Sequence, residues 1–397
     1  MKRGTAAALL ALALLAAGCA PGTASIKPAT ATPTSQPLLA HFESYIGAYR
    51  VTGGPTFVVN GFGHLLNLKD SYFRQLYPTA QADRFTVGPS FAIPAPKQAD
   101  VVFRMTAGRP DQMTFAPVEG AAVVATRLQF KETNVQVASG DAILAGTITE
   151  PLTPGPHPGI VIIHGSEPGQ RIFYGVWVGL YASLGLTVLA YDKRGNGEST
   201  GRYPGEYPTE SSLDIYAADA SAVLRFLSRW PGVDPKRVGF HGGSQGGWTV
   251  PLAIQRFHAP AAFAIIVSGP AVSVDQQGVW ASFSGSSTTL PGLSESEMDA
   301  QVRAVRSTGY DPGPVLKTIK QPMLWLNGAV DRQVPTSVSS AILRSFNHPN
   351  WDIEILPGVD HGLFENPSGL EPDESKATRL AAGLWDLIAA WLATSFN

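Results

Sequence analysis

The residue whose type and surroundings most clearly suit a chemical reaction is a serine between glycines. Ser244 stands in Gly242-Gly243-Ser244-Gln245-Gly246, after a short apolar run and before a predicted helix. A strand, a tight turn and a helix in that order would push the serine hydroxyl out at the carboxyl edge of a sheet. Glycines flank such a turn because a side chain would clash there. The pattern predicts a nucleophile for acyl transfer.

A serine hydroxyl needs a base to take its proton, and the usual base is a histidine held by a carboxylate. The histidines that follow the serine are His258, His348 and His361. His258 is expected within the helix after the serine turn, and His348 precedes a strand. We assign the base to His361, which follows the predicted strand 353–356 at the edge where the serine also lies.

The carboxylate is expected after the preceding strand, 323–326, where Asp331 is the candidate. Asp360 competes because it adjoins His361. Adjacent residues rarely hold the geometry needed to bond each other's side chains, so Asp331 is preferred.

Attack on a carbonyl develops negative charge on oxygen, and each fixed N–H donor there contributes about 2.7–4 kcal/mol. One expected donor is the backbone N–H of Gln245, next to the nucleophile. The other is the backbone N–H of Ser166, in the loop 164–169 that follows strand 160–163. His164 is expected to brace that loop.

The elements that must position these groups alternate between strand and helix from about residue 133. A mostly parallel sheet covered by helices on both faces is therefore predicted. The remaining predicted strands are 133–136 and 143–149, which form a leading antiparallel pair, then 186–191, 238–241 and 262–267; helices are predicted at 212–229 and 376–393. The segment 273–318 is long for a connection between strands, which predicts a lid over the site.

The segment from 40 to 130 has a different character, with short strands broken by Gly and Pro turns. Strands are predicted at 49–52, 57–60, 64–68, 101–106, 112–115 and 123–130. This pattern predicts a small antiparallel β barrel or sandwich. His41 and His64 are isolated there and are expected at the surface.

Composition excludes several classes of protein. The 397 residues are 44% hydrophobic and 15% charged, so a sizeable core can form. A net charge of −2 offers no basic field for nucleic acid. The single cysteine rules out an internal disulfide and a cysteine-based zinc site. No metal or organic cofactor is expected, since the sequence has no Walker loop, HExxH or dinucleotide motif.

The N-terminus resembles a bacterial lipoprotein signal. Lys2 and Arg3 precede the apolar run 6–17, which is too short to span a bilayer, and Cys19 follows Gly18. Residues 1–19 are therefore predicted as a signal with lipidation at Cys19, and 20–39 as a disordered tether. A cleaved soluble precursor is the alternative. Either reading predicts a secreted protein, and the first one a lipid-anchored protein of the cell envelope.

Residues 133–397 resemble the α/β-hydrolase superfamily. His164-Gly165, Asp192–Ser199, Ser244, Asp331 and His361 occur in the family order. The domain 131–397 is thus expected to have the α/β-hydrolase fold with a lid insertion at about 273–318. The stretches 191–201 and 231–239 look like the branch with bacterial esterases, acyl thioesterases and some aminopeptidases. In relatives the turn that starts at Asp192 is structural, which implies the same for Asp192 and Arg194.

The resemblance implies a serine hydrolase that cleaves small carboxylic esters through an acyl-enzyme. A serine at 244 argues against haloalkane dehalogenases and epoxide hydrolases, which need a carboxylate nucleophile. The alternatives are an acyl thioesterase or an aminopeptidase, whose acidic anchor for the substrate amine would be Glu297 or Asp299. An alternative that is not an enzyme is a lipid-tethered binding protein with a degenerate hydrolase fold.

Apolar residues of the predicted lid suggest an apolar acyl or aryl group in the substrate. They equally suit a lid that packs on its own domain. These residues are Val279, Trp280, Phe283, Leu290 and Leu293.

Overall fold

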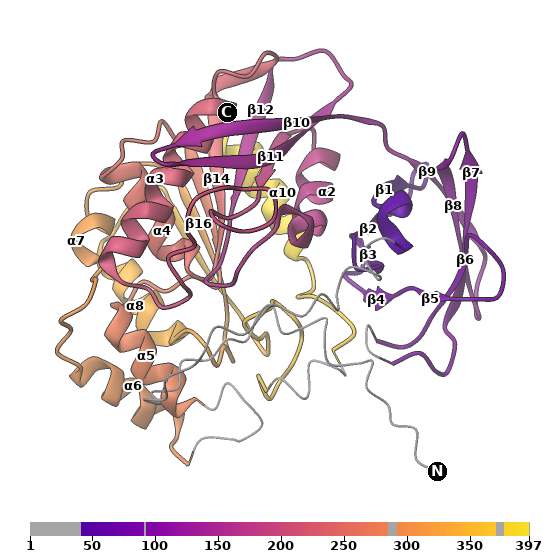
Figure 1. Ribbon diagram of the computed structural model, residues 1–397. Coiled ribbons are helices and arrows are strands. Elements are labelled where there is room, and N and C mark those ends of the chain that lie inside the picture. The colour runs from indigo at the N-terminus through magenta and orange to yellow at the C-terminus, as the bar shows by residue number, and fades with distance from the viewer. Residues whose placement is uncertain (1–40, 91–92, 285–291, 371–376, 397) are drawn as a thin grey trace, which may run out of the picture.

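A computed structural model describes residues 41–90, 93–284, 292–370 and 377–396. The predicted signal peptide, tether and lipidated Cys19, and Leu290 of the predicted lid, lie outside the described residues. The strands form a nine-stranded and an eight-stranded sheet (Figure 1). No helix within the described ranges combines the length and apolarity needed to cross a membrane.

The eight-stranded sheet is mostly parallel, as predicted. Its order is β10 (Phe130–Ser139), β11 (Ala142–Pro151), β13 (Thr187–Tyr191), β12 (His157–Ile163), β14 (Val233–Gly243), β15 (Phe263–Val267), β16 (Met323–Gly328) and β17 (Trp351–Leu356). β10, β11 and β13 pair antiparallel, and every later pair is parallel. The carboxyl ends of the parallel strands therefore meet at one edge of the sheet.

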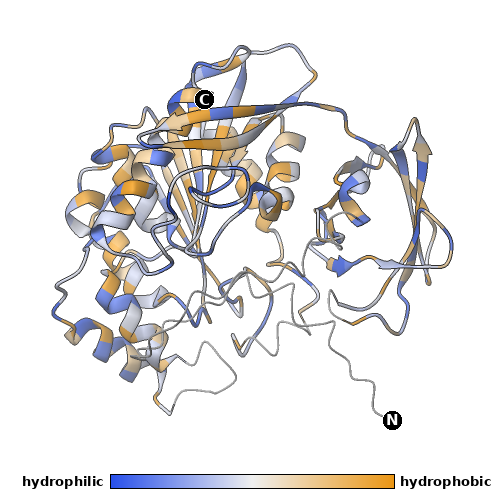
Figure 2. Ribbon diagram, viewed as in Figure 1, coloured by the Kyte–Doolittle hydropathy of each residue, from blue (hydrophilic) through white to orange (hydrophobic). Residues whose placement is uncertain are grey.

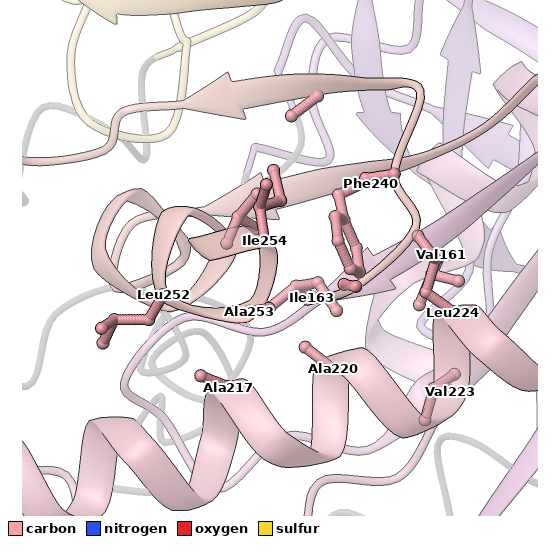
Figure 3. Close-up of a cluster of buried hydrophobic side chains, with 14 of the residues drawn as sticks. Val161, Ile163, Ala217, Ala220, Val223, Leu224, Phe240, Leu252, Ala253 and Ile254 are labelled. Atoms are coloured by element: carbon pink, nitrogen blue, oxygen red, sulfur yellow. The ribbon is translucent and has the colours of Figure 1, made fainter. Parts of the chain in front are cut away.

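Helices cover both faces of this sheet, because its central strands are apolar on both sides. Val161 and Ile163 of β12 pack into one core with helices α3 (Glu210–Leu227) and α4 (Gly246–Gln255) (Figure 3). Ile160 and Ile162 of the same strand face a second core with α2 (Gly175–Ser183) and α10 (Leu384–Ser395). Apolar residues run along the central strands accordingly (Figure 2).

The remaining helical segments are short. They are η1 (Glu43–Tyr45), η2 (Arg171–Tyr174), α5 (Val274–Phe283), α6 (Glu295–Ala304), α7 (Gly313–Leu316) and α8 (Thr336–Ser345). The helix α4 ends at Gln255, so the prediction that His258 lies inside it is wrong; His258 follows with a φ of +49°.

The prediction of the last helix was wrong at its start. The helix begins at Leu384, after Gly383 in the left-handed conformation with a φ of +73°. The residues before it are extended, because Leu380 bridges Phe364 and Arg379 bridges Tyr72. The apolar residues from Leu380 onward do have helical spacing. The backbone around Leu380 nevertheless pairs with distant segments, so it is not helical there.

The nine-stranded sheet is antiparallel and is built from the first part of the chain. Its order is β4 (Phe73–Gln75), β3 (His64–Asn67), β2 (Thr56–Val59), β1 (Gly47–Arg50), β9 (Val123–Arg127), β8 (Arg109–Pro117), β7 (Ala99–Thr106), β6 (Arg84–Val87) and β5 (Tyr77–Pro78). The two edge strands, β4 and β5, are consecutive in the chain and separated only by Leu76. The sheet must therefore curl until its edges approach each other, as in a barrel. We call this nine-stranded sheet the curled sheet.

Two sequence expectations for this sheet need correction. The predicted strand 123–130 is divided, since β9 belongs to the nine-stranded sheet and β10 starts the other sheet at Phe130. The strands β4, β5 and β6 were not predicted; β4 and β5, with three and two residues, are too short for a period of two to show.

The curled sheet packs on α2 and on the residues before α10, which cover one face of the mostly parallel sheet. Leu66 and Phe73 belong to the same core as α2 and α10. The N–H of Phe73 donates to the carbonyl of Thr378 at 2.8 Å, and the N–H of Leu380 donates to the carbonyl of Ser71 at 2.9 Å. Strands β1 to β4 lie on the side of the curled sheet that faces α2 (Figure 1).

Candidate active site

Ser244 lies in the sharp turn between β14 and α4. It is a non-glycine residue with a φ of +48°, and its N–H donates to the carbonyl of Val267 on β15 at 2.9 Å. A Cβ on Gly242 would lie 2.9 Å from Cγ2 of Val250, so only glycine fits there. A left-handed serine costs about 1–2 kcal/mol, and such strain clusters at functional sites.

His361 and Asp331 form a hydrogen-bonded pair at the ends of neighbouring strands. The Nδ1 atom of His361 lies 2.7 Å from Oδ2 of Asp331. The other carboxylate oxygen of Asp331 accepts the N–H groups of Gln333 at 2.7 Å and Val334 at 2.8 Å. These backbone bonds fix the carboxylate, which in turn orients the imidazole.

The environment of His361 favours its charged form. Its side chain is buried, and burial alone would lower its pKa. The Asp331 charge and hydrogen bond, with the Asp360 and Glu167 carboxylates, outweigh burial and raise the pKa of His361 above its ordinary value. Such a histidine can accept a proton and hold it as an imidazolium.

Asp360, the competing carboxylate, is bound elsewhere. Its oxygens accept the N–H of Phe364 at 2.9 Å and the side-chain amide of Asn366 at 3.0 Å. Burial raises the pKa of Asp360 to about 6. The structure thus brings together His361 and Asp331, whereas Asp360 is hydrogen-bonded to the loop that follows His361.

Ser244 and His361 line one pocket of about 220 Å³. Aromatic side chains dominate its walls, and some come from the curled sheet. The lining residues are Asn60, Phe62, His64, Phe73, Gly165, Glu167, Phe173, Tyr174, Val176, Trp177, His241, Gly243, Ser244, Val267, Ser268, His361, Gly362, Phe364, Leu380 and Trp385.

The expected oxyanion donors, Ser166 and Gln245, are chain neighbours of residues that line the pocket, but neither is itself among the lining residues. Gln245 immediately precedes α4, so its N–H lies at the positive end of that helix. Ser166 follows Gly165, which lines the pocket, and its carbonyl oxygen accepts the hydroxyl of Tyr203 at 2.7 Å. A ring nitrogen of His164, buried behind this loop, lies 2.7 Å from the carbonyl oxygen of Tyr191, and burial lowers the pKa of His164 to about 3. His164 therefore braces the loop as a neutral side chain.

Lys193 holds the same loop, a role that the sequence did not indicate. Its buried Nζ donates to the carbonyl oxygens of Gly165 at 2.7 Å, Ser166 at 3.2 Å and Glu167 at 3.1 Å. Burial lowers the pKa of Lys193 to about 8. The flanking residues of its turn are engaged in ion pairs, Asp192 with Arg171 at 2.5 Å and Arg194 with Asp219 at 2.7 Å.

A carboxylate lies inside the pocket at Glu167. Its Oε1 accepts the hydroxyl of Tyr174, and a Cβ on Gly165 would meet its Oε2. The acids expected as anchors for a substrate amine lie elsewhere. Glu297 caps α6 through Ser294, and Asp299 accepts the hydroxyl of Ser337.

The described residues of the predicted lid do not line the pocket. Trp280 is buried with Met298 and Val302, and Val279 and Leu293 pack against that cluster. Phe283 is exposed. Trp280, Val279 and Leu293 thus take the second of the two expected roles and pack on their own domain, whereas Phe283 takes neither role.

The pocket residues that sequence reasoning missed are aromatic and far apart in the chain. His64 was expected at the surface, but it is 5% exposed and lines the pocket. His241 lines it too, and Trp177 lies against it with ring centroids 4.3 Å apart. The position of His241, three residues before Ser244 on β14, was the one signal in the sequence. Within the described ranges, no group of three or more His, Cys, Asp and Glu side chains could hold a metal ion.

The chain is similar to several known proteins. Residues 155–303 match the family model described as serine aminopeptidase, S33. An uncharacterized protein of Mycobacterium tuberculosis is 27% identical over 251 residues, which cover 63% of this chain and 79% of that protein. Esterase EstD of Thermotoga maritima is 26% identical over 278 residues, which cover 63% of this chain and 65% of that protein. The solved structure of the Pyrococcus furiosus esterase Pf2001 is similar with a TM-score of 0.46 and 17% identity, covering 67% of this chain and 93% of that one.

Proposed function

Because this chain is a member of the α/β-hydrolase superfamily, in its serine-nucleophile branch, and is a hydrolase, we propose that it cleaves carboxylic esters through an acyl-enzyme on Ser244. The observation that carries the proposal is the His361–Asp331 pair, 2.7 Å apart, whose imidazole lines the same pocket as Ser244. The likeness to a protein named as an esterase supports the ester as substrate class.

In the proposed mechanism the Ser244 hydroxyl attacks the ester carbonyl. The Nε2 atom of His361, the ring nitrogen not bound to Asp331, accepts the hydroxyl proton, and Asp331 stabilises the imidazolium. The backbone N–H groups of Ser166 and Gln245 donate to the oxyanion. His361 then protonates the departing alcohol and later takes a proton from the water that releases the acid.

Peptide cleavage is the weaker alternative. An aminopeptidase needs an acidic group that binds the substrate amine, and neither Glu297 nor Asp299 is among the residues that line the pocket. Glu167 does line it, but its carboxylate already accepts the hydroxyl of Tyr174. Acyl thioesters would react by the same steps, so rates on matched esters, thioesters and anilides separate the three substrate classes.

A fluorophosphonate probe is expected to label the protein once, on Ser244. The probe requires a serine activated by a base, which the site provides through His361. Intact-mass and peptide mass spectrometry would locate the adduct, and loss of p-nitrophenyl acetate hydrolysis should follow labelling in proportion. A labelled protein that keeps its esterase activity, or an adduct on another residue, would contradict the proposal.

The value of kcat/KM is expected to rise with pH through an ionisation above 6.5, the ordinary pKa of a histidine. The base must be neutral to accept the serine proton, and the Asp331, Asp360 and Glu167 carboxylates favour its protonated form, so activity is lost as the pH falls through the raised pKa. Initial rates on an ester with a pH-independent leaving group would give the profile.

Asp360 provides the control for this pH profile, since its own pKa is raised to about 6. The variant Asp360→Asn should retain the ionisation, because the titrating group is His361. Circular dichroism at each pH would exclude unfolding. If kcat/KM did not change with pH below the usual histidine pKa, the assignment of His361 as the base would be refuted. The same would follow if the ionisation disappeared in Asp360→Asn.

A further inference from the structure

The pocket beside Ser244 has a wall that belongs to neither the mostly parallel sheet nor its helices. Asn60, Phe62, His64 and Phe73 of the curled sheet line it. They lie in the turn between β2 and β3, on β3 and on β4, far upstream of the serine. The curled sheet is therefore part of the site and not only a neighbour of it.

This wall is held in one conformation by its own hydrogen bonds. The side-chain oxygen of Asn60 accepts the N–H groups of Phe62 at 3.1 Å and His64 at 2.9 Å. The Asn60 amide nitrogen lies 3.2 Å from Nδ1 of His64. The Phe62 ring stacks on Phe173 with centroids 5.2 Å apart and an interplanar angle of 25°. The wall is thus a preformed surface.

The wall is also fixed to the body of the hydrolase. A Cβ on Gly179 would lie 2.6 Å from Cγ1 of Val58, so α2 approaches β2 as closely as a glycine allows. The Phe73 ring meets Phe364 edge-on at 5.4 Å, and its backbone is bonded to Thr378. The wall therefore has a fixed position relative to α2 and to the loop after His361.

The chemistry of the pocket points to a flat, uncharged group. Rings from both parts of the molecule face it, among them Phe62, Phe73, Phe173, Trp177, Phe364 and Trp385. No lysine or arginine occurs among the described residues that line it, and Glu167 contributes a carboxylate, so an uncharged group fits this lining better than an anionic one. A cavity of about 150 Å³ suffices for benzene, so the 220 Å³ here holds one ring and a short spacer.

We propose that this pocket selects esters that carry a single aromatic ring, and that Phe62 on the curled sheet is a specificity-determining residue. The inference rests on the proposed ester hydrolysis at Ser244. Aromatic pairs gain energy beyond the area they bury through offset and edge-to-face contacts. A linear chain of equal length buries similar area but makes none of these contacts.

The substrate preference can be measured by pH-stat titration with matched esters. Methyl phenylacetate and methyl 3-phenylpropanoate test the acyl side against methyl hexanoate and methyl octanoate. Benzyl acetate tests the alcohol side against hexyl acetate. On one of the two sides the aromatic ester is expected to have a kcat/KM at least about tenfold higher, since more than one ring contributes.

The role of the curled sheet is tested with a matched pair of variants. Phe62→Leu should lower the ratio of aromatic to linear kcat/KM by about threefold to tenfold. Phe115→Leu is the control, because Phe115 is also half-buried in this sheet, stacks on one phenylalanine at 5.3 Å and does not line the pocket. It should leave the ratio unchanged.

Equal rates on aromatic and linear esters, or a ratio that Phe62→Leu leaves intact, would overturn the inference. Loss of methyl hexanoate hydrolysis in Ser244→Ala tests the proposed function separately, since this ester carries no ring. Calorimetric binding of 3-phenylpropanamide and hexanamide to Ser244→Ala tests the pocket without any turnover. The aromatic amide should bind more tightly, and Phe62→Leu in that background should remove the difference.

Discussion

Replacement of Ser244 by alanine is expected to lower kcat/KM for p-nitrophenyl acetate by at least about 10⁴-fold. The variant removes the only atom that would bond to the acyl group, while the residual rate would come from the oxyanion donors and the pocket. The backbone should not change, because the N–H of residue 244 still donates to Val267 and alanine accepts the left-handed φ at a cost similar to that of serine.

Ser268 offers a matched control for this variant. It lines the same pocket at the end of the neighbouring strand, also has a positive φ, +51°, and donates its hydroxyl to the carbonyl oxygen of His361 at 2.8 Å. Loss of one such bond is worth about 0.5–1.5 kcal/mol, so Ser268→Ala should lose no more than about tenfold. Ester hydrolysis in Ser244→Ala close to that of the unchanged protein would refute the nucleophile.

Asp331→Asn is expected to lower kcat by about 10⁴-fold with little change in KM. The carboxylate accepts the Nδ1 proton of His361 and stabilises the imidazolium that forms when the serine is deprotonated. An amide can turn its NH₂ group toward Nδ1, which places the remaining proton on Nε2 and blocks the base. The fold should survive, because the amide oxygen can still accept the N–H groups of Gln333 and Val334.

Asp360→Asn is the matched comparison, since it makes the same chemical change one residue before the histidine. Its carboxylate binds Phe364 and Asn366, so activity should fall by no more than about tenfold, the worth of one hydrogen bond. A larger loss in Asp360→Asn than in Asp331→Asn would reverse the two assignments.

The same variant should change how stability depends on pH. Burial raises the pKa of Asp360 from 3.8 to about 6, so between these values the folded protein binds more protons than the unfolded chain. The free energy of unfolding therefore falls as the pH rises through this window, by about 3 kcal/mol at full ionisation. Urea denaturation at several pH values should show this fall in the unchanged protein and a flatter dependence in Asp360→Asn.

The positions of the three proposed catalytic residues could be predicted from short stretches of sequence. Ser244, Asp331 and His361 each follow a predicted strand of the parallel sheet, and parallel strands bring the positions after their carboxyl ends to one edge. The structure places them at the ends of β14, β16 and β17, with His361 bonded to Asp331. Local pattern and chain order predicted these positions at the sheet edge because each position depends on the strand that precedes it.

The lining of the pocket beside Ser244, by contrast, was determined only by the tertiary structure. Phe62 and His64 carry no local mark of their position, and His64 was expected in solvent. They line the pocket because the curled sheet docks on α2 and on the extended residues 378–381, contacts between segments that no window of sequence contains. Because of the same contacts, the last helix begins only at Leu384. Periodicity reports which face of an element is apolar, whereas the partner of that face depends on the packing of the whole chain.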